Sequence, residues 1–207
     1  MYANRRVAVL LILALIIITF IWTAPTLGMQ SADSGMAPEA VMLVATPQLQ
    51  DPLYGGTILI AKSIPGGGHV GFILNRPTQF ALSDAFPEHE QAKAVSDPLY
   101  LGGPNELDTV FALVTARDNP GKGSMQLGPD LYLVIAAETV DRLIDTAADH
   151  ARFFVGVVLW QSGELKEELR RGAWYVIETQ PELVLPKKTE GLWQELVRRA
   201  QFRERAI

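Results

Sequence analysis

Three polar residues near predicted turns carry side chains suited to acid–base or anion chemistry: Asp51, Asn75 and Arg76. A carboxylate exchanges protons, and a guanidinium presents a planar fork of donors to a carboxylate or a phosphate. Pro77 favours an extended backbone at Arg76, which fixes the corner that carries the guanidinium. The trio predicts either a hydrolytic site or a contact for an anion or a partner's acid. An internal partner for Arg76, most simply Asp51, is the structural alternative.

Two segments of nearly the same sequence accompany these residues. One runs DPLYGG from position 51, and the other runs DPLYLGG from position 97. Each combines a turn-forming Asp-Pro pair with permissive glycines. They are either two loops that feed a sheet or two backbone-lined loops that bound one concave site. The second interpretation predicts a ligand or partner surface, made of Asp51, Asn75, Arg76, Gly102, Gly103 and Pro104.

The remaining motifs do not indicate catalysis. The glycines at 66–68 precede a predicted strand, whereas a phosphate cradle needs a helix N-terminus there, so they favour a hairpin turn. His69, His89 and His150 lack the spacing of metal ligands, no serine occupies a Gly-x-Ser-x-Gly elbow, and the chain has no cysteine. No catalytic residue, metal or cofactor is predicted, and a non-catalytic role is favoured.

The two clusters of charged residues, at 164–168 and 198–205, are typical of solvent-exposed helix faces. In the acidic segment at 164–168, early acids and late arginines complement a helix dipole, and Glu167 can pair with Arg171. The basic cluster at 198–205 alternates with acids on an amphipathic terminal helix. A net charge of −5 argues against a nucleic-acid partner, which would require a clustered basic surface.

The N-terminus predicts a membrane segment. Arg5 and Arg6 precede an apolar run that starts at Val7 and ends at Trp22. A flank with positive charge stays in the cytoplasm, so residues 1–23 are expected to anchor a domain that lies outside it. Residues 24–40 resemble a flexible linker. Export after signal cleavage is the alternative.

Residues 41–207 have the length and patterning of one mixed α/β domain with a substantial sheet. Apolar, β-branched runs predict strands at 57–63, 69–75, 109–115, 131–136, 153–160 and 174–178. Apolar residues at helical spacing predict helices at 138–150, between Ser162 and Gly172, and after Thr189 as N-cap. A further helix is expected at 81–95, broken near Pro87.

Four ordered blocks resemble the bacterial YqgE/AlgH family over residues 41–207. They read ATPQLQDP from position 45, GFILNRP from position 71, LGGP from position 101, and WQSGEL from position 160 onward through Glu168 to Trp174. Where family members carry histidines, this chain has Ile64 and Thr115, and in the last block Glu164 and Lys166 also depart from the pattern. The resemblance implies a single domain in which helices flank a barrel-like sheet. Its members are often labelled transcriptional regulators and are connected with control of exopolysaccharide production.

The leading hypothesis is a membrane-tethered, non-catalytic binding or regulatory domain. It would contact a protein or a small anionic ligand at the loops of Asp51, Asn75–Arg76 and Gly102–Gly103. A hydrolase that uses Asp51, Asn75 and Arg76 is one alternative, and a cytoplasmic regulator is the other. A fold or family name alone does not decide among them.

The charge pattern at Arg5 and Arg6 predicts the side of the membrane on which the domain lies. Alkaline phosphatase fused to the C-terminus is expected to be active, because that enzyme matures only outside the cytoplasm. A fluorescent protein that folds only in the cytoplasm, fused at the same place, should stay dark. The reverse pattern of the two reporters would support the cytoplasmic regulator.

Overall fold

The computed structural model describes residues 40–186 and 188–205. The predicted anchor between Val7 and Trp22 lies outside the described residues, and so does the predicted linker apart from Ala40. Within the described part of the chain, no helix combines the length and apolar character needed to cross a membrane.

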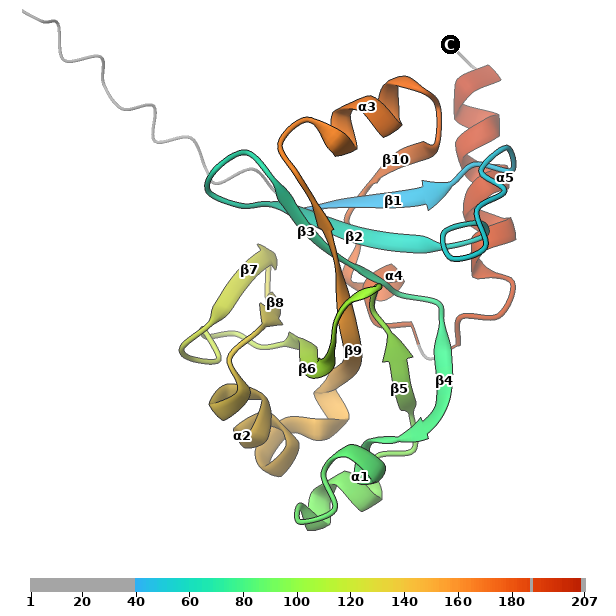
Figure 1. Cartoon of the computed structure of the whole chain (residues 1–207). Helices are drawn as coiled ribbons and strands as arrows, with labels where there is room; N and C mark the ends of the chain where they lie inside the picture. The colour runs from blue at the N-terminus through green and yellow to red at the C-terminus, as the bar shows by residue number, and fades with distance from the viewer. Residues whose placement is uncertain (1–39, 187, 206–207) are drawn as a thin grey trace, which may run out of the picture. The chain divides into compact units, whose positions relative to one another are not determined.

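The described residues form one ten-stranded sheet that curls into a half-barrel (Figure 1). Its strands are β1 (Val41–Ala45), β2 (Ile58–Ser63), β3 (His69–Ile73), β4 (Pro77–Ala81), β5 (Pro98–Leu101), β6 (Asn105–Thr115), β7 (Ser124–Gly128), β8 (Leu131–Val134), β9 (Ala151–Trp160) and β10 (Trp174–Glu178). The main path runs β10-β1-β2-β3-β9-β6-β8-β7, and β5 pairs with β4 and β9. All pairs are antiparallel except β5 with β9, which is parallel.

Strand β9 joins the two halves of the sheet. Its last residues pair with β3, from Val158 to Trp160. Its first part pairs with β6, and Phe154 and Val155 in that part also pair with β5. Since β5 and β6 meet the same stretch of β9, they lie on opposite edges of it. One long apolar strand thus carries neighbours from three parts of the chain.

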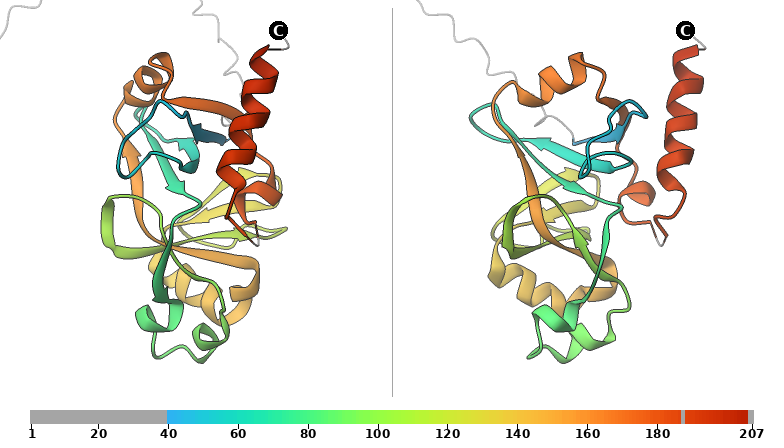
Figure 2. Two further views of the ribbon diagram at one scale, coloured as in Figure 1. Left: turned by 90° about the vertical axis from the view of Figure 1, so that its right-hand side faces the viewer. Right: turned by 45° about the vertical axis from the view of Figure 1, so that its right-hand side comes forward.

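The helices flank this sheet. They are α1 (Leu82–Ala85), α2 (Ala137–Ala147), α3 (Glu164–Arg170), α4 (Pro181–Val184) and α5 (Leu192–Arg205), with short 3₁₀ turns η1 (Glu90–Ala94) and η2 (Ala148–His150). Alternate side chains of a strand point to opposite faces. Val44 of β1 accordingly packs in one cluster with Leu196 of α5, whereas Leu43 packs with Leu165 of α3. Helices α3 and α5 therefore cover opposite faces of β1 and β2 (Figure 2).

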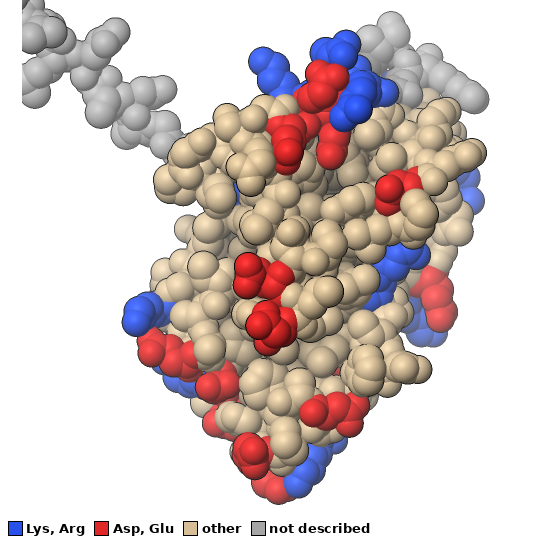
Figure 3. All heavy atoms as spheres, in the orientation of Figure 1, with Lys and Arg blue, Asp and Glu red and all other residues tan. Residues whose placement is uncertain are grey.

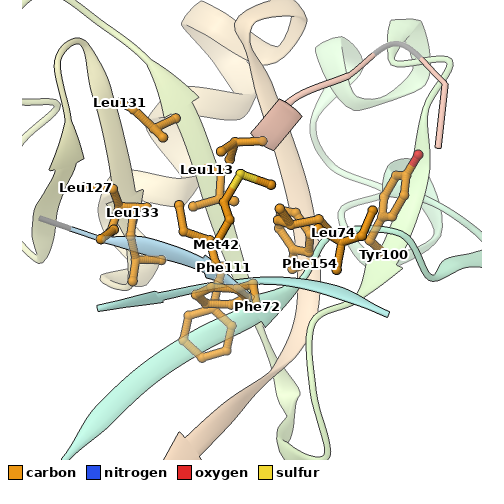
Figure 4. Close-up of a cluster of buried hydrophobic side chains, with 14 of the residues drawn as sticks. Met42, Phe72, Leu74, Tyr100, Phe111, Leu113, Leu127, Leu131, Leu133 and Phe154 are labelled. Carbon is orange, nitrogen blue, oxygen red and sulfur yellow. The ribbon is translucent and has the colours of Figure 1, made fainter. Parts of the chain in front are cut away.

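The central core is an aromatic cluster inside the curl of the sheet (Figure 4). The ring centroid of Phe72 lies 5.5 Å from that of Phe111 and 5.4 Å from that of Phe154, in tilted arrangements. Phe72 is 1% exposed and Phe154 is fully buried. Burial of a side chain of this size contributes about 1.5–3 kcal/mol. Phe72 and Phe154 come from β3 and β9, so the core supports the strands that join the two halves.

Beside this core, the chain between β5 and β6 crosses β9 at van der Waals distance, and only glycines fit there. A Cβ on Gly102 would lie 2.3 Å from the carbonyl oxygen of Gly156, and a Cβ on Gly103 would lie 2.2 Å from the backbone of Val157. Gly156 itself has φ +74°, which bends β9 at the crossing. Gly102 donates a hydrogen bond to the Val155 carbonyl at 2.8 Å and accepts one from the Ile73 N–H at 2.8 Å.

The expected mixed α/β fold, with a curled sheet and flanking helices, is confirmed for the described residues. Each predicted strand and each of the three main helices is present, with ends that differ by a few residues. The segment at 81–95 splits into α1 and η1 on either side of Pro87, and α5 begins at Leu192 rather than directly after Thr189. The short strands β1, β4, β5 and β7 and the one-turn α4 were not among the predicted elements.

The close approach of backbones at Gly103 predicts that the stability of the domain is sensitive to a single added methyl group there. Gly103→Ala should lower the free energy of unfolding by about 3 kcal/mol or more, because the added Cβ meets backbone that cannot move aside. Gly128→Ala on the edge strand β7 is the matched control, since a Cβ there meets no atom within 4 Å. Urea unfolding of both variants measures the difference. Equal stability of the two variants would contradict the proposed packing.

Candidate functional site

The side chain of Asp51 fixes the conformation of the loop that contains it. One oxygen of Asp51, Oδ1, accepts hydrogen bonds from the backbone N–H groups of Leu53 and Tyr54, both at 2.8 Å. The N–H of Gly55 donates to the carbonyl of Asp51 at 2.8 Å. Residues 46–57, which we term the Asp51 loop, therefore form a rigid turn between β1 and β2.

Asn75 and Arg76 brace this loop from the end of β3. The Asn75 amide accepts the N–H of Ile58 at 2.9 Å and donates to the carbonyl of Gly56 at 3.0 Å. Arg76 donates from Nη2 to the carbonyl of Gly55 at 2.6 Å. The internal partner of Arg76 is thus a backbone carbonyl rather than the carboxylate of Asp51, which was the simplest expectation. Both side chains position the Asp51 loop.

The predicted surface is only partly assembled as one face. Leu101 donates to the carbonyl of Arg76 at 2.8 Å, so the end of β5 does lie beside the Asn75–Arg76 corner. Gly102 and Gly103 are buried in the crossing over β9, while Pro104 is exposed. Asp51 lines a pocket whose lining includes neither Asn75 nor Arg76. The structure therefore joins Asp51, Asn75 and Arg76 through one loop, and gives the two glycines a packing role.

That pocket, of about 400 Å³, lies between the Asp51 loop and the segment from α3 to β10. Its lining comprises Thr46, Gln48, Leu49, Asp51, Tyr54, Glu168, Arg171, Gly172, Ala173 and Trp174. We term it the Tyr54–Glu168 pocket. All of these residues except Tyr54 belong to the first or the last of the four sequence blocks. Two blocks far apart in the chain therefore meet around one cavity.

One of the two acids of this pocket, Glu168, is held by two buried indoles. Glu168 Oε2 accepts the Nε1–H of Trp160 at 3.0 Å and that of Trp174 at 2.8 Å. Trp160 is 5% exposed and Trp174 is 6% exposed, so both donors need an internal acceptor. The carboxylate is fixed in orientation by the scaffold, with Oε1 not used in these two bonds. The charge pattern of the sequence had placed Glu168 on the solvated acidic face of a helix. The signal for its buried bonds is the pair of tryptophans on either side of it.

The walls of the pocket are aromatic and polar. Tyr54 meets Trp174 edge to face, with ring centroids 6.1 Å apart. Burial raises the pKa of the Tyr54 phenol, and the negative charges of Glu168 and Asp51 raise it further. The phenol is therefore neutral at physiological pH. Thr46 closes the base, with Oγ1 donating to the carbonyl of Gly172 at 2.9 Å.

Charges outside the pocket are balanced among themselves. Glu167 accepts two hydrogen bonds from Arg170 at 2.8 Å, and these bonds lower the pKa of its carboxyl, with a smaller contribution from Arg171. Arg171, on the pocket rim, lies 3.6 Å from the same carboxylate, so the predicted Glu167–Arg171 pair is present. Acidic and basic side chains accordingly gather together over α3 (Figure 3). The acids that face the pocket, Asp51 and Glu168, are not part of this balance.

A larger hollow of about 880 Å³ lies at the other end of β9, between η1, the end of α2 and the chain after α4. Arg152, which is 4% exposed, lies there with its guanidinium carbon 4.4 Å from the Tyr100 ring centroid. It bonds the carbonyl of Pro186 and lies 3.4 Å from Asp97. These contacts fasten the chain after α4 to the sheet. None of the residues that line this hollow belongs to the four blocks, so the smaller pocket is the better candidate.

Fold and site together define a mixed α/β domain with one acidic, aromatic pocket at a braced loop. A model of the family described as AlgH-like matches residues 42–205. A UPF0301 protein of Chlorobaculum tepidum is 32% identical over 76% of this chain and 83% of its own length, and one of Streptomyces avermitilis is 31% identical over 76% and 84%. The chain therefore belongs to the AlgH-like family.

Two solved structures share the fold. Protein DIP2367 of Corynebacterium diphtheriae superposes with a TM-score of 0.65 at 24% identity, over 79% of this chain and 86% of that one. The solution structure of AlgH from Pseudomonas aeruginosa gives a TM-score of 0.64 at 21% identity, over 77% and 86%. The match to the AlgH-like family model and the UPF0301 relatives confirm the resemblance to the YqgE/AlgH family noted in the sequence.

The shared carboxylate predicts a large difference between two substitutions at one position. Glu168→Ala should lower the free energy of unfolding by about 2 kcal/mol or more, because two buried indole N–H groups lose their acceptor. Glu168→Gln keeps an acceptor oxygen and should cost much less. Urea unfolding, monitored by circular dichroism, measures the free energy of unfolding of both variants. Glu167→Ala, at an exposed neighbour, should leave the midpoint nearly unchanged, and equal midpoints for all three variants would contradict the bonding described.

Proposed function

We propose that this domain is a non-catalytic binding module that acts in regulation and contacts a partner protein through the Tyr54–Glu168 pocket. The observation that supports this most directly is the fixed state of the pocket's acid. Glu168 Oε2 already accepts two indole hydrogen bonds, so the carboxylate is built into the scaffold. A binding site benefits from such rigidity, because little conformational freedom is lost when a ligand arrives.

The side chains around the pocket support binding over hydrolysis. Among the described residues that line it, none is a histidine, cysteine, serine or lysine. The hydroxyl of Thr46 donates to a backbone carbonyl, and Tyr54 has a raised pKa. A hydroxyl nucleophile needs a base within hydrogen-bond reach, and among the described residues neither hydroxyl of this lining is hydrogen-bonded to Asp51 or Glu168.

The hydrolase alternative assigns acid–base and anion-holding roles to Asp51, Asn75 and Arg76. Each of these side chains bonds backbone groups of the Asp51 loop or of the first residue of β2. Such bonds explain the presence of the three residues without any chemistry, and they favour a structural role. The loop they hold is the one that forms a wall of the pocket.

The predicted anchor between Val7 and Trp22 completes the proposal. It would hold the module at a membrane, on the outer side, and so limit its partners to proteins that reach that surface. An acidic chain with a net charge of −5 is poorly suited to nucleic acid, which supports a protein partner for a family whose members are often labelled regulators.

Site-specific photo-crosslinking in cells tests this function. A photoreactive residue at Gln48, exposed on the pocket rim, should give one discrete crosslinked product. The same residue at Gln126, exposed on β7, is the control and should give none. Tyr54→Ala should abolish the Gln48 product without unfolding the domain, as checked by thermal melting. The same product from both positions, or persistence of the Gln48 product in the Tyr54→Ala variant, would refute the assignment of the pocket.

A further inference from the structure

The described residues that line the Tyr54–Glu168 pocket carry more negative than positive charge. Its lining contains two carboxylates, Asp51 and Glu168, and a single cationic side chain, Arg171. The guanidinium of Arg171 is on the rim, is 63% exposed and lies 3.6 Å from Glu167. The raised pKa of Tyr54, caused first by burial and then by the two carboxylates, is consistent with a negative potential at the phenol.

The carboxylate of Glu168 retains capacity for another donor. Its Oε2 accepts both indole N–H groups, and none of the described residues donates a hydrogen bond to Oε1. An ionised carboxylate has about four acceptor positions on its two oxygens. The Trp160 and Trp174 bonds hold it in one orientation, so a further donor would meet an acceptor that is already aligned. A bond between a charged donor and this carboxylate would be stronger than one between neutral groups.

The walls suit an aliphatic chain with a cationic end. Leu49 and Ala173 are apolar, and the rings of Tyr54 and Trp174 offer aromatic surface beside the acid. Aromatic faces attract cations, most strongly when the surroundings are partly desolvated. Lysine and arginine bury their hydrocarbon stems along such surfaces while the charged head reaches a polar group. A cavity of about 400 Å³ lies within the usual range of ligand pockets, so one long side chain fits in it with room to spare.

We infer that the Tyr54–Glu168 pocket receives a lysine or arginine side chain of the partner protein, with its cationic head on Glu168 and its stem against Tyr54 and Trp174. This inference rests on the proposed binding function and specifies the ligand class. It replaces the expectation of an anionic ligand, because the guanidinium on which that expectation depended, Arg76, bonds the carbonyl of Gly55. Asp51 at the same pocket adds attraction for a positive charge.

The indole N–H groups of Trp160 and Trp174 provide a direct readout, since both bond the carboxylate that would bind the cation. The full chain, in mild detergent and labelled with ¹⁵N-tryptophan, is titrated with three capped single-residue amides: N-acetyl-lysine, N-acetyl-norleucine and N-acetyl-glutamate methylamide. The lysine amide should shift both indole signals in a saturable way. The norleucine amide, which has the same stem without the charge, should bind at least about tenfold more weakly. Equal binding of the norleucine or the glutamate amide would overturn the inference.

Two charge-neutral variants separate binding from folding. Glu168→Gln and Asp51→Asn each keep an acceptor oxygen for the internal bonds, so both are expected to fold. Glu168→Gln should weaken the lysine amide by about tenfold and Asp51→Asn by less, whereas Glu167→Gln, outside the pocket, should leave its affinity unchanged. Unchanged affinity in the Glu168→Gln protein would overturn the inference. If that affinity is unchanged but the photoreactive residue at Gln48 still gives its crosslinked product, only the ligand class is wrong. If that affinity is unchanged and no crosslinked product forms at Gln48, the proposed function is wrong too.

Discussion

The close approach of two backbones at Gly102–Gly103 and Gly156 is the constraint on which the rest of the domain depends. A curled sheet needs a strand that belongs to both of its halves, and β9 is that strand. Where β9 passes from β6 to β3 it bends at Gly156, and Gly102 bridges the opening by bonding Val155 of β9 and Ile73 of β3. Side chains at these positions would keep the strands apart, because interiors are packed at crystal-like density.

The shape of the pocket depends on this crossing. Since Gly102 bonds Ile73, it fixes the last residue of β3, and β3 leads directly to Asn75 and Arg76. Those two side chains hold the carbonyls of Gly55 and Gly56, and thereby the Asp51 loop. The opposite wall of the pocket is formed by the segment from α3 to β10. This segment is positioned by the C-terminal end of β9, where Trp160 leads into α3. Rigid loops positioned by a sheet are common settings for binding sites.

Strand and helix periodicity was sufficient to predict the mixed α/β class, because buried runs such as those of β2 and β9 are long and apolar. Periodicity could not show that Gly102 lies against Gly156, since a glycine in a turn and a glycine in a tight crossing look the same in a sequence. It also could not separate Glu168 from its neighbours on α3. Glu167 and Glu168 are adjacent acids, and only the positions of Trp160 and Trp174 in space give one of them a buried partner.

The bond between Glu168 and the two indoles also has a mechanical meaning. Trp160 ends β9 and Trp174 begins β10, and the strands β1, β2 and β3 lie between these two in the sheet. One carboxylate on α3 therefore links the first and the last of five neighbouring strands through two hydrogen bonds. Because Glu168 and Trp174 also line the pocket, the same two bonds restrain both the curvature of this half of the sheet and the width of the pocket.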